Sequence, residues 1–213
     1  TATIQECQAY CESKTVLGLD TETEGFDFTC KKLIMLQIGD KDRQYVIDTR
    51  VTDISCLSSV LESKKIVKIL HNAKFDYKFI KQWAGITLEE VFDTFLVERV
   101  INCGRQDYGY SLARCVERYI GDTLNKETRN KFVGLKGQPF TVDQITYGAK
   151  DVVYLCDIRE KQLVQLRNLE LESVAKLENK VVEVFSEIEF EGLMIDEDKW
   201  TVMAENNVKL AHE

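Results

Sequence analysis

Acidic side chains that could bind a metal ion follow a short apolar run near the start of the chain. The run Val16–Leu19 is typical of a strand that is buried on both faces. Asp20 follows it directly and Glu22 two residues later. We expect the strand to end at Asp20, because acids are depleted in strands. With a period of two, the two acids point to the same face. Neighbouring carboxylates repel each other unless a proton or a cation lies between them, so the pair predicts an oxygen-ligand site for Mg²⁺ or Mn²⁺. A polar strand end closed by a turn at Glu24–Gly25 is the alternative.

Two further acids stand at the edges of predicted elements. Asp76 lies just inside a helix expected after the apolar run Ile66–Leu70, and Asn72 precedes it by one turn. Tyr147 and Asp151 are four residues apart, so on a helix they are adjacent on one face. Each has a simpler interpretation alone, because Asp76 could complement a helix dipole and the Tyr147–Asp151 pair could be an ordinary surface contact.

The acids become more informative when they are considered together. Three or four carboxylates around one point can hold two divalent ions about 4 Å apart. Such a pair of ions catalyses in-line displacement at phosphorus, since one ion activates the attacking water and the other stabilises the leaving oxygen. A phenol beside that water, such as Tyr147, can position it. The pattern therefore predicts metal-dependent hydrolysis at phosphorus.

An α/β fold with a mixed sheet must position these side chains. Short apolar runs alternate with stretches of helical spacing, which favours a sheet flanked by helices. Turn residues at Gly39–Asp42 join two of the strands into a hairpin. The expected strands are 16–19, 32–39, 44–48, 66–70 and 91–92, and the expected helical stretches are 54–62, 71–83, 94–101, 111–119, 141–167 and 172–189.

Composition and charge narrow the functional class. The chain has 213 residues, of which 44% are apolar and 30% charged, and its net charge is −8. These values are typical of a soluble globular protein, and no apolar run approaches the ~20 residues needed to cross a bilayer, so no membrane partner is expected. The acidity argues against broad non-specific binding of nucleic acid, although bound cations would cancel the charge of an acidic active site.

The cysteines and histidines argue against a zinc site. The seven cysteines lack CxxC spacing, and the two histidines are His71 and His212. Most of the cysteines stand among apolar neighbours, as free thiols of a reducing compartment do. We therefore expect the cytoplasm of a bacterium or of a virus-infected cell, with an organelle as the alternative.

Three motifs together resemble a known enzyme family. Asp20-Thr21-Glu22-Thr23-Glu24-Gly25, Asn72-x₃-Asp76 and Tyr147-x₃-Asp151 are similar to the motifs of the DEDDy 3′–5′ exonucleases. Over about residues 14–168 the chain most resembles the proofreading exonuclease domain of family A (polymerase I-type) DNA polymerases. The resemblance implies a ribonuclease H-like fold with a mixed five-stranded sheet flanked by helices. It also implies two Mg²⁺ or Mn²⁺ ions and hydrolysis of single-stranded or mispaired DNA 3′ ends to 5′-mononucleotides.

The resemblance also implies roles for individual residues. Asp20, Glu22 and Asp151 would hold the nucleophile-activating ion. Asp20 would bridge to the second ion, which Asp76 would hold partly through water, and Tyr147 would orient the attacking water. The sequence departs from the family pattern after Tyr147, where Gly148-Ala149-Lys150 replaces the usual small-Ala-acid or Ala-Ala-x, and a glycine there weakens the helix slightly.

Further residues are expected to contact the substrate. Asn72 matches a position that contacts the terminal nucleotide, and Phe26 matches an apolar position that wedges against the last base. Lys74, Lys150 and the basic loop 125–138 would meet phosphates.

Two alternatives remain open. Leu33–Ile38 and Pro139-Phe140-Thr141 also resemble ribonuclease D-type RNA-trimming enzymes. A catalytically silent exonuclease-fold module is the other alternative, although all four acids are present. The segment Glu189–Asp196 resembles the beginning of a family A polymerase domain. We therefore expect an exonuclease domain over 1–170, a helical segment over 171–213, and a polymerase domain in the same native chain.

Overall fold

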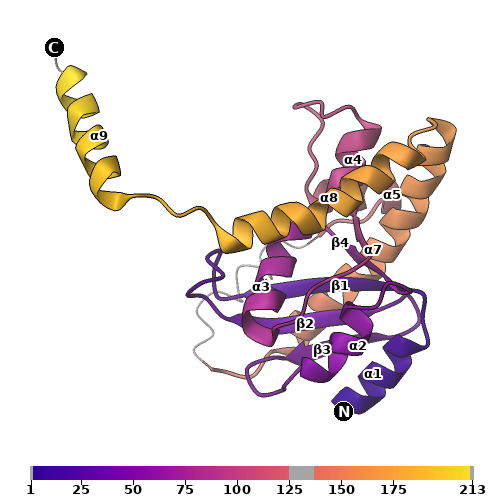
Figure 1. Ribbon diagram of the computed structural model, residues 1–213. Helices are drawn as coiled ribbons and strands as arrows, with labels where there is room; N and C mark the ends of the chain where they lie inside the picture. Colours follow the sequence, from indigo (N-terminus) through magenta and orange to yellow (C-terminus); the bar gives the residue numbers. More distant parts are fainter. Residues whose placement is uncertain (1, 125–136, 212–213) are drawn as a thin grey trace.

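A mixed five-stranded sheet forms the centre of the computed structural model, which describes residues 2–124 and 137–211 (Figure 1). The strands are β1 (Val16–Thr23), β2 (Leu33–Gly39), β3 (Gln44–Asp48), β4 (Val67–Leu70) and β5 (Val91–Asp93). Their order is β3-β2-β1-β4-β5, in which β1–β2 and β2–β3 are antiparallel while β1–β4 and β4–β5 are parallel. The predicted mixed sheet and its β2–β3 hairpin are confirmed.

Helices cover both faces of the sheet. They are α1 (Ile4–Glu12), α2 (Ser58–Leu61) after the short 3-10 helix η1 (Ser55–Leu57), α3 (Lys74–Ala84), α4 (Thr94–Ile101), α5 (Leu112–Ile120), α7 (Val142–Asn168), α8 (Glu172–Glu191) and α9 (Glu197–Leu210). Leu17 and Leu19 of β1 belong to a buried cluster with side chains of α1, α2 and α3. The opposite face of β1 lies against α7, which also contacts β2 and β3.

The central strand β1 is longer than the sequence predicts. Its expected end at Asp20 is wrong, because the ladder with β2 continues to Thr23 opposite Leu33. Every residue of β2 is buried, so pairing with this apolar neighbour outweighs the low strand propensity of the acids. Asp20 and Glu22 are therefore held within the paired strand rather than by a turn, although the register shifts between Glu22 and Thr23.

Two glycines allow α7 to approach the sheet closely. A Cβ atom on Gly18 of β1 would lie 2.7 Å from the carbonyl oxygen of Val152, and a Cβ on Gly148 of α7 would lie 2.7 Å from Nε2 of Gln37 on β2. Neither site has room for a methyl group without displacement of its neighbour. The two glycines thus fix how near the residues of α7 come to those of β1.

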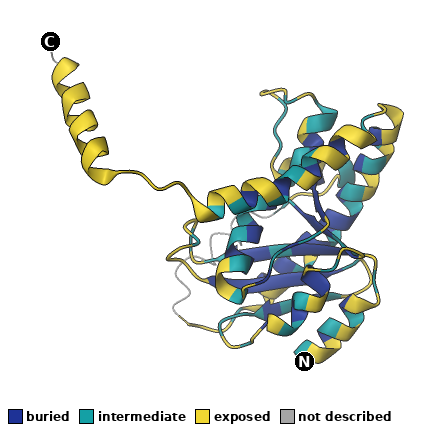
Figure 2. Ribbon diagram, viewed as in Figure 1, coloured by how far each residue is buried: buried dark blue, intermediate teal, exposed yellow. Residues whose placement is uncertain are grey.

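The C-terminal helices differ in their packing. α8 contacts α3, α4 and β5, and its buried Asn179 accepts a hydrogen bond from the backbone N–H of Asp93 at 2.6 Å. After Gly192, which ends α8, the chain leaves the body of the molecule, and every described residue of α9 is exposed (Figures 1 and 2). The domain boundary expected near residue 170 stays a prediction.

Within the described ranges, no helix is long and apolar enough to cross a membrane. The basic part of the predicted phosphate-binding loop, with Lys126, Arg129, Lys131 and Lys136, lies outside the described residues.

Candidate active site

Three carboxylates meet between β1 and α7. Asp20 and Glu22 lie on the face of β1 that α7 covers, and Asp151 approaches from α7, so that one ligand oxygen from each lies within 4.8 Å of the others. Glu22 is 9% exposed and Asp151 2% exposed. Asp20 is half-buried. Three carboxylates this close, two of them buried, repel one another unless protons or a cation neutralise them. A donor set of oxygens alone fits a hard divalent cation such as Mg²⁺ or Mn²⁺.

Asp76 reaches the same place from the other face of the sheet. It lies in the first turn of α3, is 3% exposed, and accepts a hydrogen bond from the Thr21 hydroxyl at 2.5 Å. Burial, and after it the charge of Asp20, raises the pKa of Asp76 well above the usual value, while the Thr21 hydroxyl opposes the shift. Such a perturbed carboxyl in a cleft is typical of a functional site. The structure therefore groups three of the four acids closely and places the fourth beside them.

Asp93 holds the junction from which α3 begins. Its carboxylate accepts the backbone N–H groups of Asn72 and Ala73, both at 2.9 Å, and it also caps α4 through two further backbone N–H groups. Asn72 has a φ of 67°, a left-handed conformation that asparagine tolerates better than most residues. Burial raises the pKa of Asp93 and the backbone donors oppose that shift. The side chain thus fixes the turn that carries Asn72 and leads to Asp76.

Tyr147 lies one helical turn before Asp151, as predicted. Its ring packs with Ile34 and Met35 of β2. The helix begins with a capping box, in which the Thr141 hydroxyl accepts the N–H of Gln144 and the Gln144 side chain accepts the N–H of Thr141. A fixed helix start and a packed ring hold the phenol in one place.

The four predicted acids and Tyr147 open onto one cleft of about 750 Å³. It is lined by Asp20, Thr21, Glu22, Phe26, His71, Asn72, Phe75, Asp76, Ser111, Leu112, Ala113, Leu124, Tyr147 and Asp151. Phe26 is 85% exposed and packs edge-to-face on Phe75, with the ring centroids 6.3 Å apart. An exposed aromatic ring therefore lies at the rim of the cleft that holds the acids; its predicted contact with a base stays a prediction.

The two predicted phosphate-binding lysines are not among the residues that line the cleft. The ammonium group of Lys74 forms an ion pair with Glu189 of α8. Lys150 is exposed on α7. Their roles stay predictions, and Lys74 could meet a phosphate only by leaving Glu189.

The sequence analysis missed three residues of the site. Thr21 and Asp93 contact the motif residues directly, as described above. Gln37 lies opposite Asp20 in the sheet, is fully buried against Gly148, and its side-chain amide has no hydrogen-bond partner among the described residues. A polar residue inside an otherwise apolar predicted strand was the one available signal for Gln37, since buried amides are normally bonded.

Comparison with known proteins identifies the family. A profile of the 3′–5′ exonuclease family matches residues 2–167. The chain is 30% identical to DNA polymerase I of Aquifex aeolicus over 162 residues, covering 76% of this chain and 26% of the polymerase. It is 31% identical to ribonuclease D of Escherichia coli over 151 residues, covering 70% of this chain and 39% of that enzyme.

Solved structures show the same fold. The crystal structure of Escherichia coli RNase D, described as an exoribonuclease involved in structured RNA processing, superposes with a TM-score of 0.78 at 25% identity, covering 95% of this chain and 52% of that one. Brucella melitensis NrnC with bound Mg²⁺ superposes with a TM-score of 0.75 at 20% identity, covering 84% and 86%.

The chain belongs to the 3′–5′ exonuclease family and has its ribonuclease H-like fold. It is therefore a nuclease, a hydrolase that acts on nucleic acid. Enzymes of the DEDD class generally depend on divalent metal ions, and the acidic cluster that such ions require is present. The chain spans about a quarter to two fifths of the length of these curated relatives, 26% of the polymerase and 39% of ribonuclease D.

Proposed function

We propose that this chain removes 5′-mononucleotides from single-stranded or mispaired DNA 3′ ends, with two Mg²⁺ or Mn²⁺ ions held by Asp20, Glu22, Asp76 and Asp151. The observation that carries the proposal is the group of carboxylates from β1 and α7 whose ligand oxygens lie within 4.8 Å of one another. When bound, the ions would activate water and stabilise the charge that develops at phosphorus and on the leaving oxygen.

The side chains of the cleft supply binding and orientation. The Tyr147 phenol, held one turn from Asp151, orients the attacking water through a hydrogen bond, so that the water is aligned with the leaving oxygen. Phe26 stacks on the terminal base from the rim, and Asn72 contacts the terminal nucleotide. Thr21 donates its hydroxyl hydrogen to Asp76 and keeps that carboxylate in place.

The substrate could be DNA or RNA, and different relatives support each choice. The relative Aquifex aeolicus DNA polymerase I supports DNA as the substrate. A polymerase domain in the native chain stays an expectation, because more of the similar relatives are ribonuclease D enzymes. A second candidate, trimming of RNA 3′ ends, is favoured by the ribonuclease D relatives, of which the Escherichia coli enzyme is 31% identical. The 2′-hydroxyl is the group by which a protein tells the two substrates apart.

Metal dependence is the first experiment. Hydrolysis of a 3′ end should require Mg²⁺ or Mn²⁺ and stop in EDTA. Asp20→Ala and Asp151→Ala should each lower the turnover by orders of magnitude while the circular dichroism spectrum is unchanged. Asp42→Ala, which removes an exposed acid outside the cleft, is the matched control. Full activity in EDTA would exclude the two-ion site, and an inactive wild-type protein would support the silent-module alternative.

Substrate choice is the second experiment. The proposal predicts faster digestion of single-stranded and mispaired DNA ends than of paired ends, because a paired end must first be opened at a cost of a few kcal/mol. Matched and mispaired primer termini should be compared with RNA of the same sequence. Equal rates on paired and frayed DNA ends, or a strong preference for RNA, would favour the RNA-trimming candidate.

A further inference from the structure

A row of aromatic rings leads away from the cleft along the connection between α4 and α5. His71, which lines the cleft, packs edge-to-face on Phe95 of α4, with ring centroids 5.6 Å apart. Phe95 packs on Tyr110 at 6.2 Å, and Tyr110 packs on Tyr108 at 5.7 Å. All four rings are half-buried, so each leaves part of its surface open to solvent. Tyr110 also directly precedes Ser111, another residue of the cleft wall.

Guanidinium groups accompany these rings. The Arg99 guanidinium lies 5.8 Å from the ring centroid of Phe95 and 5.4 Å from that of Tyr110. Arg118 lies 3.8 Å from the ring centroid of Tyr108. Arg99 is exposed, and among the described residues the arginine ion pairs involve Arg50, Arg105, Arg114, Arg118 and Arg167 but not Arg99. Aromatic rings and cations are two features that proteins combine to bind single-stranded nucleic acid.

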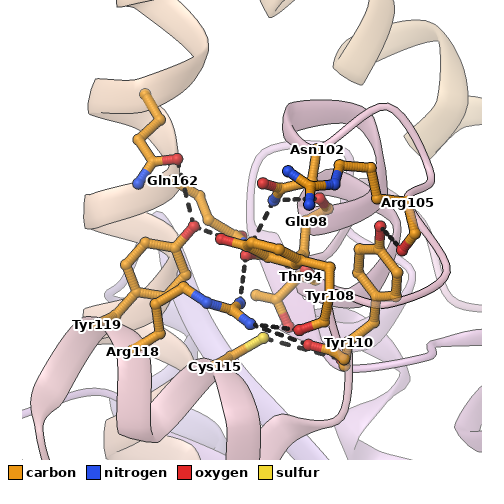
Figure 3. Close-up of polar contacts among 12 residues, drawn as sticks. Thr94, Glu98, Asn102, Arg105, Tyr108, Tyr110, Cys115, Arg118, Tyr119 and Gln162 are labelled. Carbon is orange, nitrogen blue, oxygen red and sulfur yellow. Dashed lines mark hydrogen bonds and ion pairs between the residues drawn. The ribbon is translucent and has the colours of Figure 1, made fainter.

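A buried polar network holds the connection between α4 and α5, which we call the loop, in place (Figure 3). Glu98 of α4 is fully buried and pairs with Arg118 of α5 at 2.6 Å. The same carboxylate accepts the Tyr119 hydroxyl at 2.6 Å and the Gln162 amide of α7 at 2.8 Å. Arg118 in turn donates to the carbonyl oxygens of Tyr108 and Gly109 at 3.1 and 3.0 Å. The loop is thus anchored to three helices.

A buried ion pair of this kind is costly unless its hydrogen bonds are satisfied, and here several are. Arg118 donates hydrogen bonds to main-chain oxygens of this connection as well as pairing with Glu98. The backbone that carries Tyr108 is therefore fixed. Tyr110 is fixed by its own hydroxyl, which donates to the carbonyl oxygen of Arg105 at 2.6 Å. Rings that are held rigidly and half-exposed bind flat ligands at little entropic cost.

We propose that Phe95, Tyr110 and Tyr108 form a stacking track for the single strand that lies 5′ of the nucleotide being removed, with Arg99 contacting its phosphates. The proposal rests on the proposed action of the cleft on a 3′ end, and it extends that site by several nucleotides. The track begins at His71 in the cleft wall, so a strand whose 3′ end reaches the acids can continue onto it. Stacking accepts any base, so the track would confer preference for strand length rather than for sequence.

Binding measurements in EDTA test the track without cleavage. A fluorescently labelled single-stranded octanucleotide and a dinucleotide should be titrated by anisotropy, as DNA and as RNA. The wild-type protein should bind the octanucleotide more tightly. Tyr108→Ala and Tyr110→Ala should each weaken octanucleotide binding roughly 5- to 150-fold, which is the ~1–3 kcal/mol of one base–aromatic stack. The ratio of the two dissociation constants should fall toward one.

Three variants serve as controls, and a fourth, Arg99→Ala, tests the phosphate contact. Tyr108→Phe keeps the ring and should keep the affinity of the octanucleotide. Gln106→Ala, at an exposed position of the same loop, should bind as the wild type does. Arg99→Ala should lower the slope of log Kd against log salt concentration by about 0.7, the value for one phosphate contact with a single strand. Arg114→Ala removes an exposed arginine that is paired with Glu117 and should leave that slope unchanged.

The outcomes separate this proposal from the assignment of the catalytic acids. If Asp20→Ala cleaves normally, the proposed metal site fails, but the binding ratio is still read in EDTA. Unchanged octanucleotide affinity in folded Tyr108→Ala and Tyr110→Ala proteins would refute the track and leave the rings as a packing cluster. Equal loss of affinity for the dinucleotide and the octanucleotide would also refute it, because the track acts only on the longer strand.

Discussion

Asp76→Asn is expected to stabilise the metal-free protein while it abolishes activity. The substitution keeps the shape of the side chain and an oxygen that can accept the Thr21 hydroxyl, which lies 2.5 Å from the carboxylate. It removes a charge from a side chain that is 3% exposed and that feels the charge of Asp20. Replacing a buried, repelled charge by a neutral isostere is often stabilising, since the desolvation penalty disappears.

The magnitude follows from linkage between protonation and folding. Because the pKa of Asp76 is raised in the folded state, the folded chain holds this proton more tightly than the unfolded chain, and stability falls as the pH rises above the unfolded value of about 3.9. At pH 7 this penalty cannot exceed about 4 kcal/mol, the cost of keeping an ordinary Asp protonated there. We expect about 1–3 kcal/mol, or roughly 3–10 °C in Tm for a chain of this size.

The assay is urea and thermal unfolding in EDTA between pH 4 and pH 7, followed by addition of Mg²⁺. The stability difference between Asp76→Asn and the wild type should be near zero at pH 4 and grow as the pH rises. Mg²⁺ should stabilise the wild type by mass action and the variant much less. Asp42→Asn, at an exposed acid, should show none of these effects. A metal-free Asp76→Asn protein that is less stable than the wild type at pH 7 would refute the reasoning.

Three other substitutions test the positions of single groups. Tyr147→Phe should lower the exonuclease rate about 10- to 100-fold, less than loss of Asp20, because it removes only the alignment of the water; an unchanged rate would make the phenol structural. Gly148→Ala should lower the unfolding free energy by ~1–3 kcal/mol because its methyl group would overlap the Gln37 side chain, whereas helix propensity alone predicts a gain of about 1 kcal/mol. Phe26→Ala should raise KM for a single-stranded end roughly 5- to 150-fold, which corresponds to the ~1–3 kcal/mol of one base stack, and should leave the metal affinity unchanged. A change in metal affinity would count against the assignment of Phe26 as a base-stacking residue.

Much of the fold could be predicted from local patterns. The runs that became β2 and β4 are apolar and short, and the helices around Asp76 and Asp151 have clear apolar spacing. The shared face of Asp20 and Glu22 could also be predicted, because side chains two residues apart lie on the same face of any strand. These local patterns therefore predict whether a segment is a helix or a strand and which face each side chain occupies.

The features that could not be predicted from the sequence depend on tertiary contacts. The true end of β1 at Thr23 is set by pairing with β2, which no local propensity reports. Gly148 looked like a weak point of a helix, yet its missing Cβ is what admits Gln37. The role of Asp93 as an acceptor for a distant backbone turn needs the parallel pairing of β4 and β5 before it can be seen.

The geometry of the site follows from the register of one strand. Thr21 points to the face of β1 that carries Leu17 and Leu19, which are fully buried against α1, α2 and α3, and there it meets Asp76. Asp20 and Glu22 point to the opposite face, which α7 covers. A slip of β1 by one residue would exchange the two sets and bury the carboxylates in the apolar cluster. The same leucines that stabilise the core therefore also keep the acids directed toward α7, so core packing and catalytic geometry cannot be varied independently in this strand.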